Sequence, residues 1–91
     1  MTSEGKLVAS VNRYCKDNGW FQVNLIQTNV NGIPDRLIYK DGRYIWLELK
    51  ADDGKPSPIQ THRISSMKSK GMEVHVIYSL NELKEIIDEN S

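Results

Sequence analysis

Residues 35–50 read DRLIYKDGRYIWLELK and decide the fold, because two strand-like runs are separated only by Asp41-Gly42. An Asp-Gly pair is a favoured two-residue turn of a β-hairpin, and the runs on either side are rich in β-branched, aromatic and other apolar residues. A two-residue turn pairs Lys40 with Arg43, so the numbers of all cross-strand partners sum to 83. We therefore predict an antiparallel hairpin whose register is fixed by its turn.

This register predicts that two acidic residues face each other. Asp35 lies opposite Glu48, and Lys50 follows on the same face of the sheet, because side chains alternate along a strand. Such cross-strand neighbours have Cβ atoms roughly 4.5 to 5.5 Å apart, where like charges repel. Carboxylate oxygens are ligands that Mg²⁺ prefers, and one or two of them commonly hold it. The pattern therefore predicts a partly built cation site.

A solvated polar edge is the alternative interpretation of these residues. Asp35 follows Pro34 and fits an Asx-type turn as well as a ligand. However, Leu37 and Trp46 fall on the same face as the carboxylates. Charges beside buried aromatic groups need partners, which favours the cation site.

The rest of the chain alternates between helical and strand patterns. We expect a first helix from an N-cap at Ser3 to Gly19, a strand over 20–26, a loop over 27–34, a helix from 58 or 59 to about 70, a strand within 72–78, and a final helix opened by a capping box at Ser79 and Glu82. The order α-β-β-β-α-β-α predicts a small α/β fold, with a mixed β-sheet flanked by helices on both faces.

Composition limits the function. The 91 residues suit one domain, 1–91, with no internal repeat or linker. Twelve basic residues balance twelve acidic ones, so contacts with phosphates must come from a local basic patch or a bound cation. The single cysteine excludes a disulfide framework and a Cys-rich zinc site. With no apolar run near the ~20 residues of a membrane span, we expect a cytoplasmic protein with no membrane contact.

Three motifs then carry a family resemblance: GIPD at 32–35, LELK at 47–50 and GKPSPIQ at 54–60. In this order they closely resemble the VRR-NUC (virus-type replication-repair nuclease) branch of the PD-(D/E)XK nuclease superfamily. The resemblance extends to Glu4 in the first helix and to Gly71 before the VHVIY strand, and the length is similar to stand-alone phage-type members. It implies a restriction-endonuclease-like core.

The resemblance also implies a ligand set. Asp35 and Glu48 would ligate a divalent metal, Mg²⁺ or Mn²⁺, with the backbone carbonyl of Leu49 as a further oxygen ligand. Lys50 would orient or activate the attacking water. Glu4 matches a glutamate that reaches the metal site, often through water, although an acid in the first turn is also favoured by the helix dipole.

Further residues would position or contact the substrate. Gln60 matches a glutamine thought to help place the substrate or the lysine, whereas an isolated glutamine is commonly a surface residue. Ile64 stands where the family often carries a tyrosine, so no hydroxyl is available there. We expect Lys55, in the loop after the ELK motif, to contact DNA. His62 and Arg63 are further candidates, with a solvated helix face as their alternative.

Two other reactive residue types have structural interpretations. His75 lies in the VHVIY strand, and the spacing of the two histidines does not suit a zinc site. We therefore expect a hydrogen-bonded sheet histidine. Cys15 falls on the apolar stripe of the first helix and is expected to pack as a small hydrophobic residue.

The resemblance and the two facing acids, Asp35 and Glu48, together predict a Mg²⁺- or Mn²⁺-dependent endodeoxyribonuclease without an organic cofactor. We call these two residues the acid pair. We expect a homodimer that is selective for branched or Holliday-junction DNA, in the cytoplasm of a phage-infected or other prokaryotic cell. The main alternative is a catalytically inactive nuclease-fold module that binds DNA or a replication or repair partner. A small interaction domain with coincidental carboxylates is the third hypothesis.

Overall fold

A computed structural model describes residues 2–89. In chain order its elements are α1 (Ser3–Asp17), β1 (Phe21–Asn24), β2 (Arg36–Lys40), β3 (Arg43–Leu49), α2 (Pro58–Ser69), β4 (Val74–Ile77) and α3 (Leu80–Glu89). The strands form one sheet in the order β1-β2-β3-β4. β1, β2 and β3 are antiparallel, while β3 and β4 are parallel and joined by α2. The predicted small mixed sheet and its element order are confirmed.

The hairpin of β2 and β3 has the predicted turn and register. Asp41 and Gly42 both have positive φ, 50° and 85°, which is the requirement of the tightest hairpin turn. Lys40 pairs with Arg43, and the pairing continues to Arg36 opposite Leu47. β2 begins at Arg36, so the residue that precedes it enters the site from the end of a loop.

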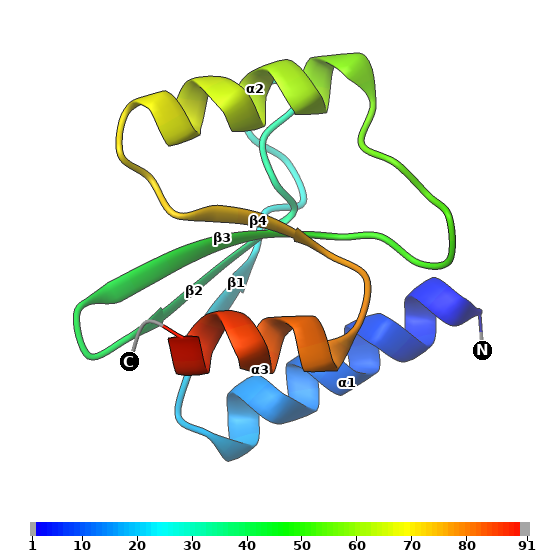
Figure 1. Cartoon of the computed structure of the whole chain (residues 1–91), viewed down its shortest axis with the longest axis vertical. Helices are drawn as coiled ribbons and strands as arrows, with labels where there is room; N and C mark the ends of the chain where they lie inside the picture. The colour runs from blue at the N-terminus through cyan, green and yellow to red at the C-terminus, as the bar shows by residue number, and fades with distance from the viewer. Residues whose placement is uncertain (1, 90–91) are drawn as a thin grey trace.

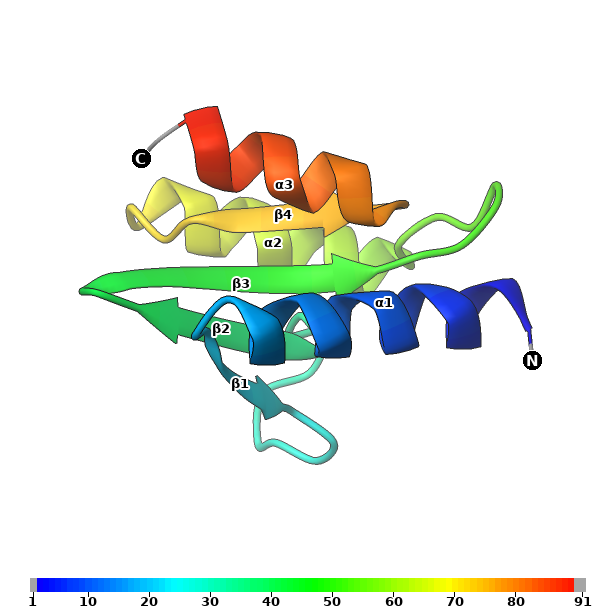
Figure 2. The same ribbon diagram turned by 90° about the horizontal axis from the view of Figure 1, so that it is seen from below.

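The helices form two layers, one on each face of the sheet. In Figure 1, α2 lies above the sheet and α1 and α3 lie below it. Figure 2, seen from below, has α1 and α3 in front of the strands and α2 behind them. No helix within residues 2–89 is long and apolar enough to cross a membrane. The two-sided helical cover predicted from the element order is therefore confirmed.

Each layer has its own core. The core under α1 and α3 is larger and contains Leu7, Val11, Cys15, Trp20, Ile38, Ile45, Leu47, Leu49, Ile77 and Leu83. The core under α2 is smaller and contains Ile64, Met67 and Val74, with Ile33, Trp46 and Val76 packed against it. Because β3 side chains alternate, Leu47 and Leu49 face the larger core, while Trp46 faces α2. Glu48 therefore also points to the α2 side.

The helix ends differ from the sequence expectation at one position. The N-cap of α1 is Thr2, whose hydroxyl accepts a hydrogen bond from Gly5 N–H at 3.0 Å, so the expected N-cap at Ser3 is wrong by one residue. Both residues carry the required hydroxyl, and local sequence alone does not separate them. At the other end, Gly19 has φ of 77° directly after the C-cap, as expected.

The first strand is shorter than expected. It covers Phe21–Asn24 rather than 20–26, because Trp20 is buried against α1 and its N–H donates to Cys15 O. Just beyond Asn24, Leu25 N–H donates to Asp35 O at 2.8 Å. The chain then leaves the sheet, and the predicted strand end at 26 is wrong.

Candidate metal centre

The two predicted acids and the predicted lysine converge on the α2 side of the sheet. Glu48 lies in β3 and is 3 % exposed, Asp35 lies at the entrance to β2, and Lys50 follows the last residue of β3. Asp35 N–H donates to Glu48 Oε1 at 3.1 Å, and Lys50 Nζ lies 3.5 Å from Glu48 Oε2. The hairpin register continued by one step also places Asp35 opposite Glu48. A loop end and one strand thus supply all three groups.

Gln60 completes the hydrogen bonds of the buried glutamate. Its Nε2 donates to Glu48 Oε2 at 3.2 Å. The orientation of this amide follows from a capping box at the start of α2: Gln60 Oε1 accepts from Ser57 N–H at 2.9 Å, and Ser57 Oγ accepts from Gln60 N–H at 3.3 Å. Because the amide oxygen is used by the cap, the amide nitrogen faces the carboxylate. The SPxQ sequence therefore both starts the helix and supports the site.

The loop before Asp35 is held against the first turn of α2. Gly32 has φ of 76°, and a Cβ on it would lie 2.6 Å from the backbone oxygen of Ile59. Only glycine allows both this backbone conformation and this close approach. Arg63 Nε adds a bond to Asn31 O at 3.0 Å. The GIPD sequence thus brings Asp35 to the site through a packed loop.

Asp35 carries an unfavourable charge at this place. Burial raises its pKa to about 6, and the charge of Glu48 also raises it. Arg36, a backbone hydrogen bond from Leu49 and the charge of Lys50 act in the opposite direction. One carboxylate oxygen, Asp35 Oδ1, is buried without a hydrogen-bond partner among residues 2–89. This acid is therefore held in a position that favours its neutralisation by a proton or a cation.

Arg36 is a buried residue that the sequence reasoning missed. It is 6 % exposed, and its Nη1 donates to Asn12 Oδ1, Gln22 Oε1 and Asn24 Oδ1 at 3.0, 3.0 and 2.8 Å. Arg36 alternates with Leu37 along β2 and shares the α1 face with buried Ile38. An arginine at a core-facing position of a strand was the signal that could have identified it, since buried charges need partners.

The structure brings some predicted residues together and leaves others apart. Residues 2–89 contain no group of three or more His, Cys, Asp or Glu side chains able to hold a metal, so Glu4 does not join the two acids in such a group. Glu4, Lys55 and His62 are exposed. Arg63 is half-buried and already ties the 25–34 loop to α2. Their ligand or DNA-binding roles stay predictions.

The residues present fit a hard divalent cation. The two carboxylates supply oxygen donors, and Asp35 Oδ1 lacks a hydrogen-bond partner among residues 2–89. Burial, and then the charge of Glu48, raises the pKa of Asp35. Mg²⁺ commonly takes one or two protein carboxylates, with waters or substrate phosphates as its other ligands. Two acids therefore suffice. The backbone of Leu49 runs beside them, since its N–H bonds Asp35.

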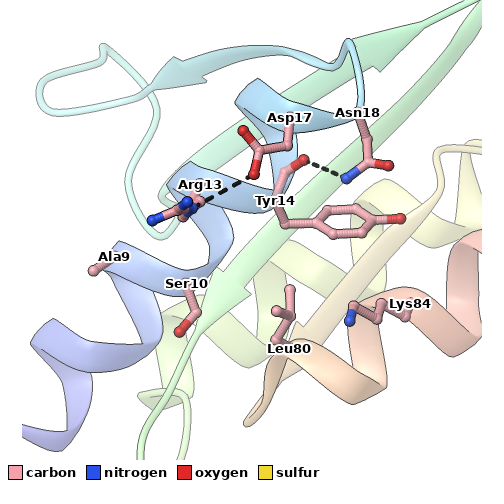
Figure 3. Close-up of a pocket in the computed structure, with 8 residues that line it drawn as sticks. All are labelled: Ala9, Ser10, Arg13, Tyr14, Asp17, Asn18, Leu80 and Lys84. Carbon is pink, nitrogen blue, oxygen red and sulfur yellow. Dashed lines mark hydrogen bonds and ion pairs between the residues drawn. The ribbon is translucent and has the colours of Figure 1, made fainter.

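Hollows elsewhere on the surface have a different character. A hollow of about 630 Å³ lies between α1 and α3, on the opposite side of the sheet from Glu48 (Figure 3). There Arg13 pairs with Asp17 at 3.5 Å, and Asn18 Nδ2 donates to Tyr14 O. Arg13 and Asp17 are thus engaged with each other, and Lys84 Nζ lies over the Tyr14 ring at 5.8 Å from its centroid. A second hollow of about 390 Å³ is lined by residues of the 25–33 segment and by the start of α2. Gln60, which lines this hollow, also donates to Glu48.

The residues with structural interpretations behave as predicted. His75 Nε2 lies 3.0 Å from Glu73 Oε2, so it is a hydrogen-bonded sheet histidine. Cys15 is 1 % exposed within the larger core, and burial raises the pKa of its thiol to about 11. Ile64, at the position where the resembling family often carries tyrosine, lies on α2 and is buried in the smaller core.

Comparison with known proteins identifies the fold. No protein-family model matches the chain, and no curated protein matches it. A solved structure described as a VRR_NUC domain superimposes with a TM-score of 0.84 at 23 % identity, over 97 % of this chain and 97 % of that chain. The chain therefore has the fold of the VRR-NUC domain along nearly its whole length, and the fold implied by the three sequence motifs is confirmed.

Proposed function

We propose that this protein is a Mg²⁺- or Mn²⁺-dependent endodeoxyribonuclease that hydrolyses phosphodiester bonds. The observation that carries the proposal is the contact of Asp35 with buried Glu48, beside the ammonium of Lys50, at the carboxyl end of β3 in a VRR-NUC fold. A fold alone supports many activities, so the nuclease chemistry that we propose depends on these three groups.

Each group has a chemical role in the proposal. Asp35 and Glu48 hold the divalent cation, with the Leu49 carbonyl and a water-mediated Glu4 as further ligands. When bound, the cation would act as a Lewis acid and neutralise the charge that develops on the phosphate. Lys50 presents three N–H donors and positions either the attacking water or a phosphate oxygen.

Glu48 must keep its orientation while it ligates the cation. The Gln60 amide and the Asp35 N–H already fix both of its carboxylate oxygens on the protein side. Such outer hydrogen bonds orient ligating carboxylates and tune their basicity. Gln60 therefore supports the reaction by holding Glu48.

Substrate binding would use local cations, because the whole chain has no net charge. We propose Lys55 and His62, both exposed, and Arg63 as contacts to the DNA backbone. A domain of 91 residues offers little surface against the roughly 1,000 Å² of a specific DNA interface. A homodimer with twofold symmetry would supply two sites and match the symmetric strands of a four-way junction. We therefore propose branched DNA as the preferred substrate.

Cleavage of defined DNA forms tests the activity. A four-way junction, a flap and a plain duplex are incubated with wild type, Asp35→Asn and Lys50→Ala in Mg²⁺. We expect cleavage of branched DNA by wild type and a loss of at least 100-fold in each variant, within the range seen when an electrostatic or acid-base group is removed. Lys84→Ala, on α3 across the sheet, is the matched control and should cut normally. Unchanged cleavage by either site variant would contradict the role assignments.

The homodimer requires a separate measurement. Light scattering of the protein alone and with a four-way junction reports the mass of each species. We expect two protein chains per junction. A single chain on saturated junction DNA would contradict the dimer while leaving the chemistry of the acid pair intact.

A further inference from the structure

The guanidinium of Arg36 is buried in surroundings that a contribution to the stability of the fold does not explain. Its side chain is 8 % exposed, and its Nη1 is held by three neutral side-chain oxygens, from Asn12 on α1 and from Gln22 and Asn24 on β1. We call these three residues the amide cage. Burying a cation among neutral dipoles is costly, and a neutral residue of similar size would serve packing better.

The other edge of the guanidinium points to the acid pair. Arg36 Nε is buried and has no hydrogen-bond partner among the described residues, and the same holds for Asp35 Oδ1. These two atoms lie 3.8 Å apart. That distance is within reach of an ion pair and too long for a hydrogen bond, which needs about 3 Å. A movement of less than about 1 Å would therefore bring this unsatisfied donor within hydrogen-bond distance of the unsatisfied acceptor.

We propose that Arg36 is the positioning residue of the metal centre, and that its Nε–H donates to Asp35 Oδ1 when the site binds a divalent cation. The inference rests on the proposed function, because it needs Asp35 to be a ligand. A carboxylate that ligates a cation through one oxygen is typically hydrogen-bonded through the other. The amide cage holds the guanidinium so that Nε stays aimed at the acid.

The geometry requires arginine rather than any cation. The guanidinium is planar and presents Nη1 and Nε in a fixed fork, so one side chain reaches the cage and the acid together. A lysine keeps the charge, but its single nitrogen cannot serve both partners. Arg36→Lys therefore removes the proposed hydrogen bond, while the positive charge near the bound metal ion stays nearly the same.

The first experiment measures cation affinity by isothermal titration calorimetry with Mn²⁺ at neutral pH. We expect Arg36→Lys to bind Mn²⁺ about 10- to 100-fold more weakly than wild type, the range found for residues that orient metal ligands. The matched control is Arg43→Lys. Arg43 is a half-buried arginine bonded to Glu73 and to carbonyls of α3, away from the acid pair. It should lose stability yet bind Mn²⁺ as wild type does.

The main readout of the second experiment uses wild type, so it does not depend on how a variant folds. The ¹⁵N–¹H resonance of Arg36 Nε is followed by NMR as Mg²⁺, which is diamagnetic, is added to wild type. We expect a downfield shift of the Hε proton as the hydrogen bond to Asp35 forms. We expect no shift in Asp35→Asn, because this variant lacks the carboxylate that would ligate the cation. Asn24→Ala, which opens the amide cage, should weaken Mn²⁺ binding several-fold.

The outcomes separate this inference from the proposed function. If wild type binds Mn²⁺ and Arg36→Lys binds it within twofold of wild type, or if the Arg36 Nε resonance is unmoved at saturating Mg²⁺, the positioning role is overturned while the metal centre stands. If wild type itself binds no divalent cation, the proposed function is overturned together with this inference. Weaker binding in Arg36→Lys alone, with Arg43→Lys unaffected, supports it.

Discussion

Replacing Asp35 by asparagine should stabilise the protein in the absence of a divalent cation. Asp35 carries its charge in a partly buried position and beside Glu48, and the replacement keeps the shape of the side chain while it removes that charge. The rise in the Asp35 pKa from 3.8 to about 6 corresponds to roughly 3 kcal/mol of destabilisation by the ionised form. Since the side chain is 45 % exposed, solvent screening reduces this to about 1 kcal/mol.

The sign of the pH dependence follows from the raised pKa. Below the unfolded pKa of 3.8 the carboxyl is protonated in both states, so Asp35→Asn gains nothing there. The gain grows as pH rises from about 4 to about 6 and is constant above that. At neutral pH, about 1 kcal/mol should raise the melting temperature by about 4 to 8 °C in a domain of this size.

Addition of a cation should reverse the order of stability. At a Mg²⁺ concentration about 100 times its Kd, wild type gains about 2.7 kcal/mol from binding, and Asp35→Asn, which lacks a ligand, gains much less. Thermal melts followed by circular dichroism, with EDTA and with Mg²⁺, measure both effects. Glu85→Gln, an exposed acid on α3, is the control and should change neither. If Asp35→Asn is less stable than wild type in EDTA, the ionised Asp35 does not destabilise the fold as expected.

Three further variants test contacts that hold the site or the fold. Gly32→Ala places a Cβ against the backbone of α2 at positive φ, so chemical denaturation should report a loss of about 2 kcal/mol or more, and an unchanged stability would contradict the close approach. Gln60→Ala removes the Gln60 side-chain half of the capping box and a donor to Glu48, and should cost about 1 to 2 kcal/mol in the same assay. A neutral effect would exclude this double role. Arg43 holds the pKa of Glu73 below its usual range, so the stability that this ion pair supplies is present above pH 4.5 and is lost as pH falls through the lower folded pKa. Glu73→Gln should therefore be about 1 kcal/mol less stable than wild type at neutral pH and equally stable in acid. A difference that persists at low pH would contradict the ion pair.

The hairpin and its register could be predicted because they depend on neighbouring residues. Asp41-Gly42 fixes the turn, and the turn fixes which residues face each other, so the approach of Asp35 to Glu48 follows from the sequence between them. The alternation of Glu48 with buried Leu47 and Leu49 similarly fixes which face carries the acids.

Other parts of the site depend on contacts between distant segments, which no local pattern reveals. The amide cage gathers Asn12 from α1 and two β1 side chains around Arg36, and it exists only once helix and sheet are packed. The bond of Gln60 to Glu48 likewise needs α2 to lie over β3. Sequence motifs identified Gln60 by resemblance, whereas its capping box explains physically why its amide faces the acid.

A crystal soaked in Mn²⁺ tests the central claim most directly, because anomalous scattering locates the ion without reference to activity. The account predicts one strong peak within coordination distance, about 2.0 to 2.4 Å, of carboxylate oxygens from both Asp35 and Glu48. A map without a peak between these residues at saturating Mn²⁺, or with the ion bound only elsewhere on the surface, would contradict the account.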